Sequence, residues 1–533
     1  MKINIFRLLL IWIFFSVSII NGQTASQLSV RDFGAKGDGI TLDTKAIQNA
    51  IDECSSKGGS VLFPPGKYLT GGLELKDNVD IYLSNGALIL GSTDVKDYKE
   101  HQPAMKSYND IFLKHSLLYA EKVKNISIRG EGTIDGQGAS FRVTTKIKPD
   151  RYRDRPYIIR FIQCENVKLE NVTLQNSAMW MQHYLACTGL TLRGIKVYNH
   201  ANQNNDMMDI DGCKNVLIEN CIGDTDDDAI TLKSTSPVLN ENVVISNCIV
   251  SSHCNAIKMG TESTGGFKNI IISDIIVKPS ADKEPFFGTP AGTSGITLAT
   301  VDGGIIDGVI ISNVKIDGPE IPIFLRLGNR GRKHTESAPT PTVGIFKNVQ
   351  ISNVIATNIK NIGCSIMGLP EHYIEDVTFS NIRIVFSGGV SKTRIKNDLP
   401  ELEDAYPEGN MWGILPSYGF YIRHAKGIKF DGITISTASE DQRPAIMLND
   451  AEDIRIASLD ASVSNEANCL IGIDKSNNIL VENSRASGGA QNFVSVSDAD
   501  TKNIFLFGND FRGFKNPAEQ KKKGQVKLIS NIK

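Results

Sequence analysis

A short phrase of alternating apolar residues recurs roughly every 25 residues and constrains the fold more than any other feature of the chain. Each copy opens on a turn residue, alternates apolar and polar positions up to an Asn, Asp or Gly, and then alternates again. The copies that open at 166, 189, 215, 242 and 269 are 23, 26, 27 and 27 residues apart. Those at 427, 453, 478 and 503 are 26, 25 and 25 residues apart. Because period-two alternation in β-branched runs is typical of strands, the repeat predicts an all-β chain.

A coil this short leaves no room for a crossover helix, so each strand must pair in parallel with the same strand of the next coil. The sequence therefore predicts a right-handed parallel β-helix whose interior is filled by Val, Ile and Leu. Asn at the turns suits bends that need a left-handed backbone. The helical pattern of 44–54 predicts an N-terminal capping helix over the otherwise open first coil.

We predict a single β-helix catalytic domain over 23–533, with loop insertions near 279–306, 327–345 and 386–424, where the repeat lengthens. Residues 1–22 are typical of a cleaved signal peptide, since their apolar run is too short to span a bilayer. We expect a secreted or periplasmic monomer without a membrane anchor. Nine cysteines, none in a C-x-x-C pair, are expected to be buried and reduced.

Carboxylates gather on two consecutive coils. When the coils are aligned by the apolar pairs that begin at 208, 230 and 257, Asp206, Asp228 and Asn255 occupy equivalent positions. Asp227 lies beside Asp228, so three carboxylates should converge on one face of the rod. Like charges this close raise the pKa of one member, and a protonated acid beside ionised bases suits glycosidic bond hydrolysis. A Ca²⁺ site, or a set of plain turns, is the alternative interpretation.

Several motifs resemble glycoside hydrolase family 28, the polygalacturonase-like hydrolases of pectin. The most specific are Asn204-Asn-Asp206 and Asp224-Thr-Asp-Asp-Asp228, supported by 132–138 and 176–183 and by an N-terminal cap over 30–71. The resemblance implies a secreted inverting hydrolase of α-linked galacturonide-type bonds in pectic polysaccharide or oligosaccharide, similar to a polygalacturonase or a rhamnogalacturonan hydrolase. It also implies Asp227 as general acid and a general base shared by Asp206 and Asp228.

Two departures from the pattern of the family that the chain resembles indicate a divergent branch. The family's Gly-His-Gly is Cys254-Asn255-Ala256 here, and its Arg-Ile-Lys is Thr297-Leu298-Ala299. We therefore expect other residues to bind the substrate. These residues are Asn204, Asn255, Lys258, Arg326, Trp412, Arg423 and His183.

The last insertion is expected to wall one end of the groove with its aromatic residues and to make the enzyme exo-acting. No metal and no cofactor are expected, because the carboxylates are committed to acid–base work. The near-neutral balance, 57 Lys and Arg against 59 Asp and Glu, excludes a nucleic-acid footprint. A β-helix polysaccharide lyase and a hydrolase of a neutral α-galactoside are the alternatives.

Overall fold

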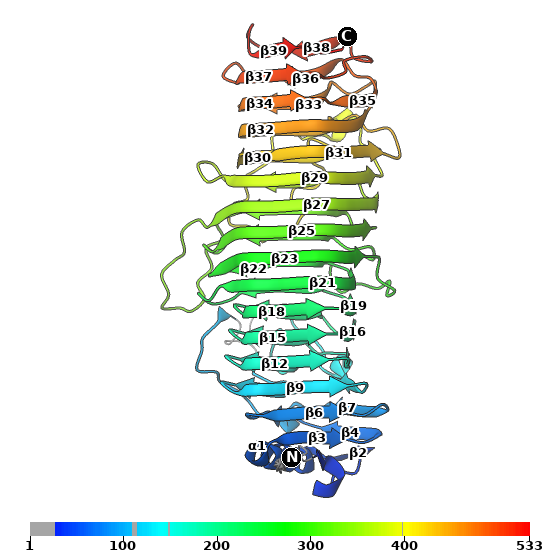
Figure 1. Ribbon diagram of the computed structural model, residues 1–533, viewed down its shortest axis with the longest axis vertical. Helices are drawn as coiled ribbons and strands as arrows, with labels where there is room; N and C mark the ends of the chain where they lie inside the picture. Colours follow the sequence, from blue (N-terminus) through cyan, green and yellow to red (C-terminus); the bar gives the residue numbers. More distant parts are fainter. Residues whose placement is uncertain (1–26, 109–113, 148–149, 397, 533) are drawn as a thin grey trace, which may run out of the picture.

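The computed structural model describes residues 27–532 except 109–113, 148–149 and 397. The described chain is a right-handed parallel β-helix, as predicted, drawn as a long rod in Figure 1. The capping helix α1 (Thr44–Lys57) closes the N-terminal end and buries Ile47, Ala50 and Ile51. Short 3-10 helices lie at Val30–Phe33, Val95–Asp97, Gly138–Ser140 and Lys392–Arg394. The predicted signal peptide, 1–22, lies outside the described residues.

Strands stack in three columns, and every strand pairs in parallel with its equivalent on the neighbouring coil. The first column consists of β5 (Leu73–Glu74), β8 (Ser116–Glu121), β11 (Tyr157–Ile162), β14 (Gln182–Leu185), β17 (Met208–Asp211), β20 (Ile230–Ser234), β22 (Asn255–Ser263), β24 (Ser294–Thr300), β26 (Ile321–Leu327), β28 (Cys364–Met367), β30 (Phe420–Lys426), β33 (Cys469–Asp474), β36 (Asn492–Val496) and β38 (Asn516–Glu519). This column carries the candidate site.

The second column runs along the opposite wall. It consists of β1 (Gln27–Ser29), β3 (Gly59–Phe63), β6 (Val79–Leu83), β9 (Lys124–Gly130), β12 (Glu165–Glu170), β15 (Thr188–Arg193), β18 (Lys214–Glu219), β21 (Asn240–Ser252), β23 (Gly266–Val277), β25 (Ile305–Asp317), β27 (Ile345–Ile359), β29 (Ile374–Phe386), β31 (Lys429–Thr437), β32 (Ile446–Val463), β34 (Asn477–Glu482), β37 (Lys502–Phe507) and β39 (Val526–Ile529). The long members, β21, β23, β25, β27, β29, β31 and β32, also continue into the third column, and β32 begins in the first column, where Ile446 pairs with Phe420 and Ile471.

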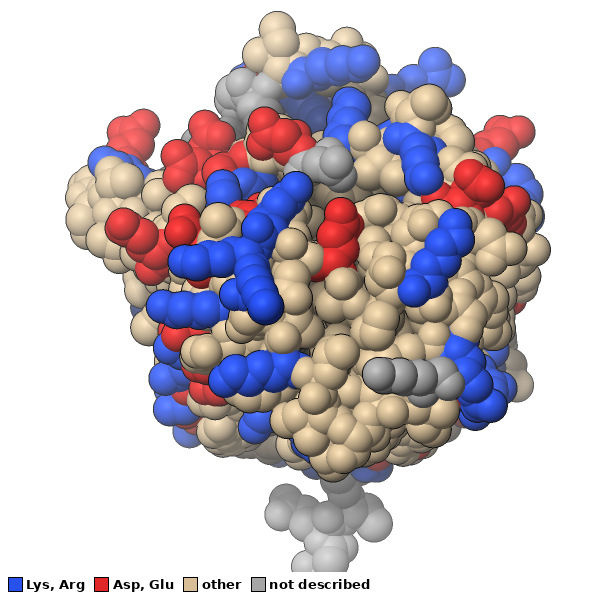
Figure 2. All heavy atoms as spheres, turned by 90° about the horizontal axis from the view of Figure 1, so that it is seen from above, with Lys and Arg blue, Asp and Glu red and all other residues tan. Residues whose placement is uncertain are grey.

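The third column is separate only where the strands are short. Its members are β2 (Asp38–Leu42), β4 (Gly66–Thr70), β7 (Ala87–Gly91), β10 (Thr133–Asp135), β13 (Thr173–Gln175), β16 (Lys196–Asn199), β19 (Ile222–Thr225) and β35 (Arg485–Gly488). Seen from the C-terminal end, basic and acidic side chains both dot the surface of the rod, in keeping with the near-zero net charge (Figure 2).

Asparagine ladders hold the bends between strands. Asn215, Asn242 and Asn269 have φ of 56°, 58° and 56°, the left-handed geometry expected from the sequence. The Asn242 amide donates to Asn215 Oδ1 at 3.1 Å, and the Asn269 amide donates to Asn242 Oδ1 at 3.2 Å. The same residue type therefore supplies both the turn conformation and a coil-to-coil hydrogen bond.

The interior and the insertions follow the repeat with two differences. All nine cysteines are buried and free, as expected. Part of the expected insertion at 279–306 is strand β24, so the loop itself spans 278–293. The last insertion spans 387–419, because β30 resumes the first column at Phe420. Both insertions are shorter than expected because a strand resumes before the predicted end. Ser294 and Phe420 begin strands that pair with the preceding coil, and the lengthened spacing of the repeat gave no sign of them.

Candidate active site

The register of the first column places the predicted carboxylates together. Met208 pairs with Ile230, and Ile230 pairs with Ile257, which is the alignment expected from the sequence. Asp206 and Asp228 stand two positions before this row on neighbouring coils, and Asn255 on the next coil begins β22. Carboxylate oxygens of Asp206, Asp227 and Asp228 all lie within 4.8 Å of one another.

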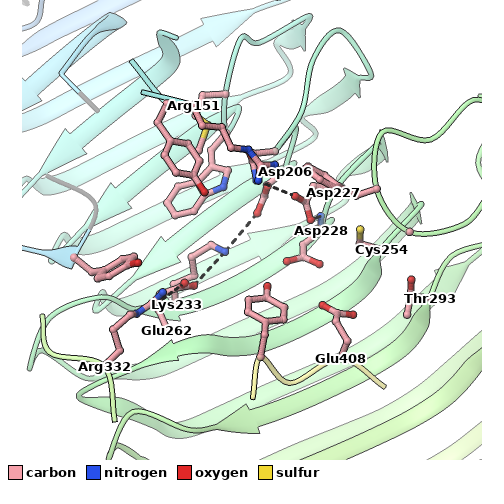
Figure 3. A pocket seen from close by; sticks show the side chains of 18 of the residues that line it. Arg151, Asp206, Asp227, Asp228, Lys233, Cys254, Glu262, Thr293, Arg332 and Glu408 are labelled. Atoms are coloured by element: carbon pink, nitrogen blue, oxygen red, sulfur yellow. Dashed lines mark hydrogen bonds and ion pairs between the residues drawn. The ribbon is translucent and has the colours of Figure 1, made fainter. Parts of the chain in front are cut away.

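These carboxylates open into a pocket of about 420 Å³. Figure 3 shows them along one side of it, facing Lys233, Glu262 and Arg332. The pocket is lined by Tyr108, Arg151, Tyr152, Met179, Trp180, Asn204, Asp206, Asp227, Asp228, Lys233, Cys254, Glu262, Phe287, Gly288, Thr293, Arg332, Tyr406, Glu408 and Asn410. This volume falls in the usual range of small-molecule binding sites, ~300–1,000 Å³.

Burial and mutual repulsion perturb the protonation of these acids. Burial, with a further contribution from the Asp228 charge, raises the pKa of Asp227 to about 7. Burial and then Asp209 raise the pKa of Asp206 well above its usual range. A carboxyl group with a pKa near 7 is protonated at mildly acidic pH and can serve as a general acid.

Asp228 is held by three donors. Lys258 Nζ lies 2.8 Å from Asp228 Oδ2, and Asn255 donates to Oδ1 from its side-chain amide at 2.7 Å and from its backbone N–H at 3.2 Å. Thr297 Oγ1 donates to Asn255 Oδ1 at 2.8 Å and so fixes the amide's orientation. Asn255 and Lys258, predicted as substrate contacts, are 1% and 2% exposed. Their place is therefore behind Asp228, where they position this carboxylate.

Lys233 forms the opposite anchor of the acidic group. Its Nζ lies 3.4 Å from Asp206 Oδ2, 3.3 Å from Asp209 Oδ1 and 3.6 Å from Glu262 Oε2. Although burial opposes it, Asp209, Asp206 and Glu262 raise the pKa of Lys233 well above its usual range. Lys233 and Lys258 therefore each form an ion pair with one carboxylate of the cluster, Asp206 and Asp228 respectively.

Four residues predicted to bind substrate have other partners. His183 is fully buried, with Nε2 3.0 Å from Asp211 Oδ2. Arg326 is 1% exposed and donates to the carbonyls of Gly368, Glu401 and Leu402. Trp412 donates from Nε1 to Pro400 O at 2.9 Å, and Arg423 donates to Leu399 O at 2.7 Å.

The correction has a physical reason. Arg326 and Arg423 both pair with Met367, so they share one outward-facing row, which would lie at the surface of a bare solenoid. The 387–419 insertion folds over that row. It places the centre of the Trp412 ring 5.2 Å from Cζ of the Arg326 guanidinium. These side chains fasten the insertion to the rod, and none of them lines the pocket.

The residues that sequence reasoning missed come from the strand face and from loops. Lys233 lies two residues after Thr231 on β20, so both side chains point outward. The period-two alternation could therefore have indicated that Lys233 lies on the face that carries the carboxylates. Arg332, Arg151 and Tyr406 lie in loops that carry no periodic signal. Arg332 Nη2 binds Glu262 Oε1 at 2.7 Å, and Tyr406 Oη lies 3.4 Å from Lys258 Nζ. Asn204, which is predicted to bind substrate, lines the pocket, with Nδ2 3.4 Å from Asp227 Oδ2.

Comparison with known proteins identifies relatives of this solenoid. A probable polygalacturonase of Vitis vinifera is 34% identical over 221 residues, which cover 39% of this chain and 45% of that protein. An exo-poly-alpha-D-galacturonosidase of Dickeya chrysanthemi is 28% identical over 250 residues, covering 38% of this chain and 41% of that protein. The chain thus spans less than half the length of these curated relatives.

The fold is shared with a solved exopolygalacturonase of Thermotoga maritima, with a TM-score of 0.56 and 22% identity over 68% of this chain and 87% of that one. The model of glycosyl hydrolases family 28 matches residues 83–401, which include the carboxylate cluster, Lys233, Lys258 and Arg332. On this match over more than half of its length, the chain belongs to glycosyl hydrolases family 28.

Proposed function

We propose that this protein is an exported, exo-acting hydrolase of α-linked galacturonide-type bonds in pectic polysaccharide or oligosaccharide. One observation carries the proposal: three carboxylates from adjacent coils converge in a pocket whose other walls hold Arg151, Lys233 and Arg332. The acids suit glycosidic bond cleavage, and the cations suit a sugar that carries a carboxylate. The names of the polygalacturonase relatives agree with this substrate class.

In the proposed mechanism, Asp227 donates its proton to the glycosidic oxygen as the bond to the anomeric carbon breaks. A water molecule attacks that carbon and gives its proton to Asp228, while Asp206 helps to orient the water. Asp228 suits the role of base because three donors stabilise its negative charge. Asp227 suits the role of acid because burial raises its pKa to about 7.

The stereochemistry is proposed to be inverting, on the family resemblance. Carboxyl groups in inverting glycosidases usually lie ~6.5–9.5 Å apart, and those in retaining enzymes ~5–5.5 Å apart. The nearest oxygens here lie within 4.8 Å, so the separation alone does not favour inversion. Inversion is supported instead by Asp206 and Asp228, two carboxylates that can hold one attacking water between them. Proton NMR of the first product decides, because an inverting enzyme releases the β-anomer from an α-linked substrate.

The exo-acting mode rests on the 387–419 insertion. It brings Tyr406, Glu408 and Asn410 to the pocket, where they form part of its wall (Figure 3 shows Glu408). A walled pocket accepts a chain end and releases one small product from the start. Export is proposed from the pattern of residues 1–22, and no helix among the described residues is long and apolar enough to cross a membrane.

Incubation with oligogalacturonides and polygalacturonate, followed by chromatography and mass spectrometry, tests the proposal. We expect saturated galacturonic acid or a single short oligomer from the earliest time point. An unsaturated, ultraviolet-absorbing product would identify a lyase. Turnover of neutral α-galactosides alone would contradict the galacturonide assignment, and early mixed oligomers would contradict the exo-acting mode.

A further inference from the structure

A second cluster of ionisable groups lies beside the active site and outside the pocket lining. Each member directly follows a strand of the third column: His200 follows β16, Asp226 follows β19 and His253 follows β21. Because Asn199 pairs with Thr225 and Thr225 pairs with Ser252, the three residues stack on consecutive coils. One potential ligand atom from each lies within 4.8 Å of the other two.

The outer nitrogen of each imidazole is already bound to an acceptor. His200 Nε2 lies 3.0 Å from Asp224 Oδ1, and this carboxylate also accepts from Ser280 Oγ at 2.6 Å. His253 Nε2 lies 3.1 Å from the backbone carbonyl of Asp282. When both Nε2 atoms donate, both Nδ1 atoms present lone pairs to Asp226. Histidines that bind metals are oriented in this way, by a carboxylate or a carbonyl on the far nitrogen.

Two acceptor atoms at the centre of the cluster have no donor among the described residues. His200 Nδ1 and Asp226 Oδ2 are buried and have no hydrogen-bond partner among the described residues, and Asp226 itself is fully buried. His253 Nδ1 lies 3.1 Å from Asp226 Oδ1, and a proton on Nδ1 makes this contact a hydrogen bond that a bound metal ion would displace. Buried acceptors of this kind are costly unless a donor or a cation compensates them.

We propose that His200, Asp226 and His253 bind a divalent transition-metal ion, for which Zn²⁺ is the probe. Two imidazole nitrogens and one carboxylate are a donor set suited to Zn²⁺, with water as the remaining ligand. Ligand atoms on a tetrahedral zinc lie roughly 3.4 Å apart, so no pair in the cluster needs to close by more than about 1.4 Å. This ion takes no part in the acid–base steps, which Asp206, Asp227 and Asp228 perform.

The ion would secure one wall of the active-site pocket. The 278–293 loop closes over the cluster, with the Phe286 N–H donating to Asp226 Oδ1 at 2.7 Å and the Thr289 N–H to His253 O at 2.8 Å. The same loop contributes Phe287, Gly288 and Thr293 to the pocket. A metal bound here would link three coils and this loop, and its removal should loosen substrate binding.

Zinc binding to the whole exported protein provides the test. After chelator treatment and gel filtration, titration calorimetry and elemental analysis should find one Zn²⁺ per chain. His200→Ala and His253→Ala should weaken binding on the order of 100-fold or more, beyond the ~10–100-fold typical of losing an outer-shell partner. His372→Ala, at an exposed histidine, is the matched control and should bind as the wild type does. If the wild type and the three variants all bind the same amount of zinc, below one ion per chain, the cluster is only a hydrogen-bonded network and the proposal is overturned.

A second measurement keeps the test independent of variant folding. Co²⁺ loaded into the wild-type protein should give the visible bands of nitrogen and oxygen ligation. Intense thiolate charge-transfer bands would place the metal on the cysteines and overturn the proposal. Zinc binding that is lost in Asp228→Asn and kept in His200→Ala would place it on the catalytic carboxylates, with the same consequence.

Discussion

Replacement of Asp227 by Asn removes the proposed general acid while changing the structure very little. Asp227 Oδ1 accepts the backbone N–H of Asp228 at 3.0 Å, and an amide oxygen can keep that bond. Oδ2 accepts from Asn204 Nδ2 at 3.4 Å, a long contact whose loss should cost little stability. The substitution also removes a charge from a crowded acidic group. We therefore expect Asp227→Asn to fold and melt like the wild type.

The expected loss of activity follows from the proton that the amide cannot donate. Positioned acid catalysis contributes ~10²–10⁴-fold, which corresponds to roughly 2.7–5.4 kcal/mol of activation free energy. With a pKa of about 7, Asp227 is almost fully protonated at mildly acidic pH, so the whole effect should appear there. kcat on oligogalacturonides should fall by this factor, while KM changes little because the pocket keeps its shape.

An activated substrate sharpens this assay. An aryl galacturonide whose phenol leaves without protonation should be cleaved by the variant at a rate much closer to that of the wild type. Asp274→Asn is the matched control, since this carboxylate is exposed at a turn and accepts from the Asn313 amide at 3.0 Å. Near-normal turnover of natural substrate by Asp227→Asn, or an equal loss on both substrates, would refute the assignment of Asp227 as the acid.

Three further predictions concern pH, charge and stability. In chelator-treated enzyme, kcat/KM should fall as pH rises through about 7, because Asp227 must be protonated to act, and a rate that rises there would contradict its role. Arg332→Gln should raise KM for acidic substrates more than for neutral ones, and an equal effect on both would assign Arg332 only to holding Glu262. Lys258→Met should cost ~3–5 kcal/mol by leaving the buried Asp228 charge unpaired. At an unfolding entropy of ~2.1 cal/mol/K per residue, this lowers Tm by about 3–5 °C in calorimetry. Lys426→Met, which breaks an exposed pair with Glu452, should change Tm by less than about 1 °C, and equal shifts would contradict the reasoning.

What the sequence predicts well is what the repeat encodes. Alternation gives the strands, the spacing gives the parallel register, and the apolar row through Met208, Ile230 and Ile257 then fixes where Asp206 and Asp228 stand. These inferences need only neighbouring coils. Side chains in insertions depend on tertiary contacts that have no period. The alternation predicts that Arg326 points outward, but it does not predict that the insertion covers and buries this side chain.

The pocket thus has two parts with different physical origins. Asp206, Asp228 and Lys233 stand on or beside rigid strands of the first column, so their separation is set by coil spacing and is insensitive to loop sequence. Arg332 and Tyr406 reach the pocket from insertions, and these can change length without disturbing the solenoid. If the proposed substrate is correct, this division accounts for a chain that has Thr297-Leu298-Ala299 where the family has Arg-Ile-Lys: the cation Arg332 reaches the pocket from a loop instead of from a strand. The acid–base chemistry should therefore tolerate changes in these loops, whereas the sugar that the pocket accepts should change with them.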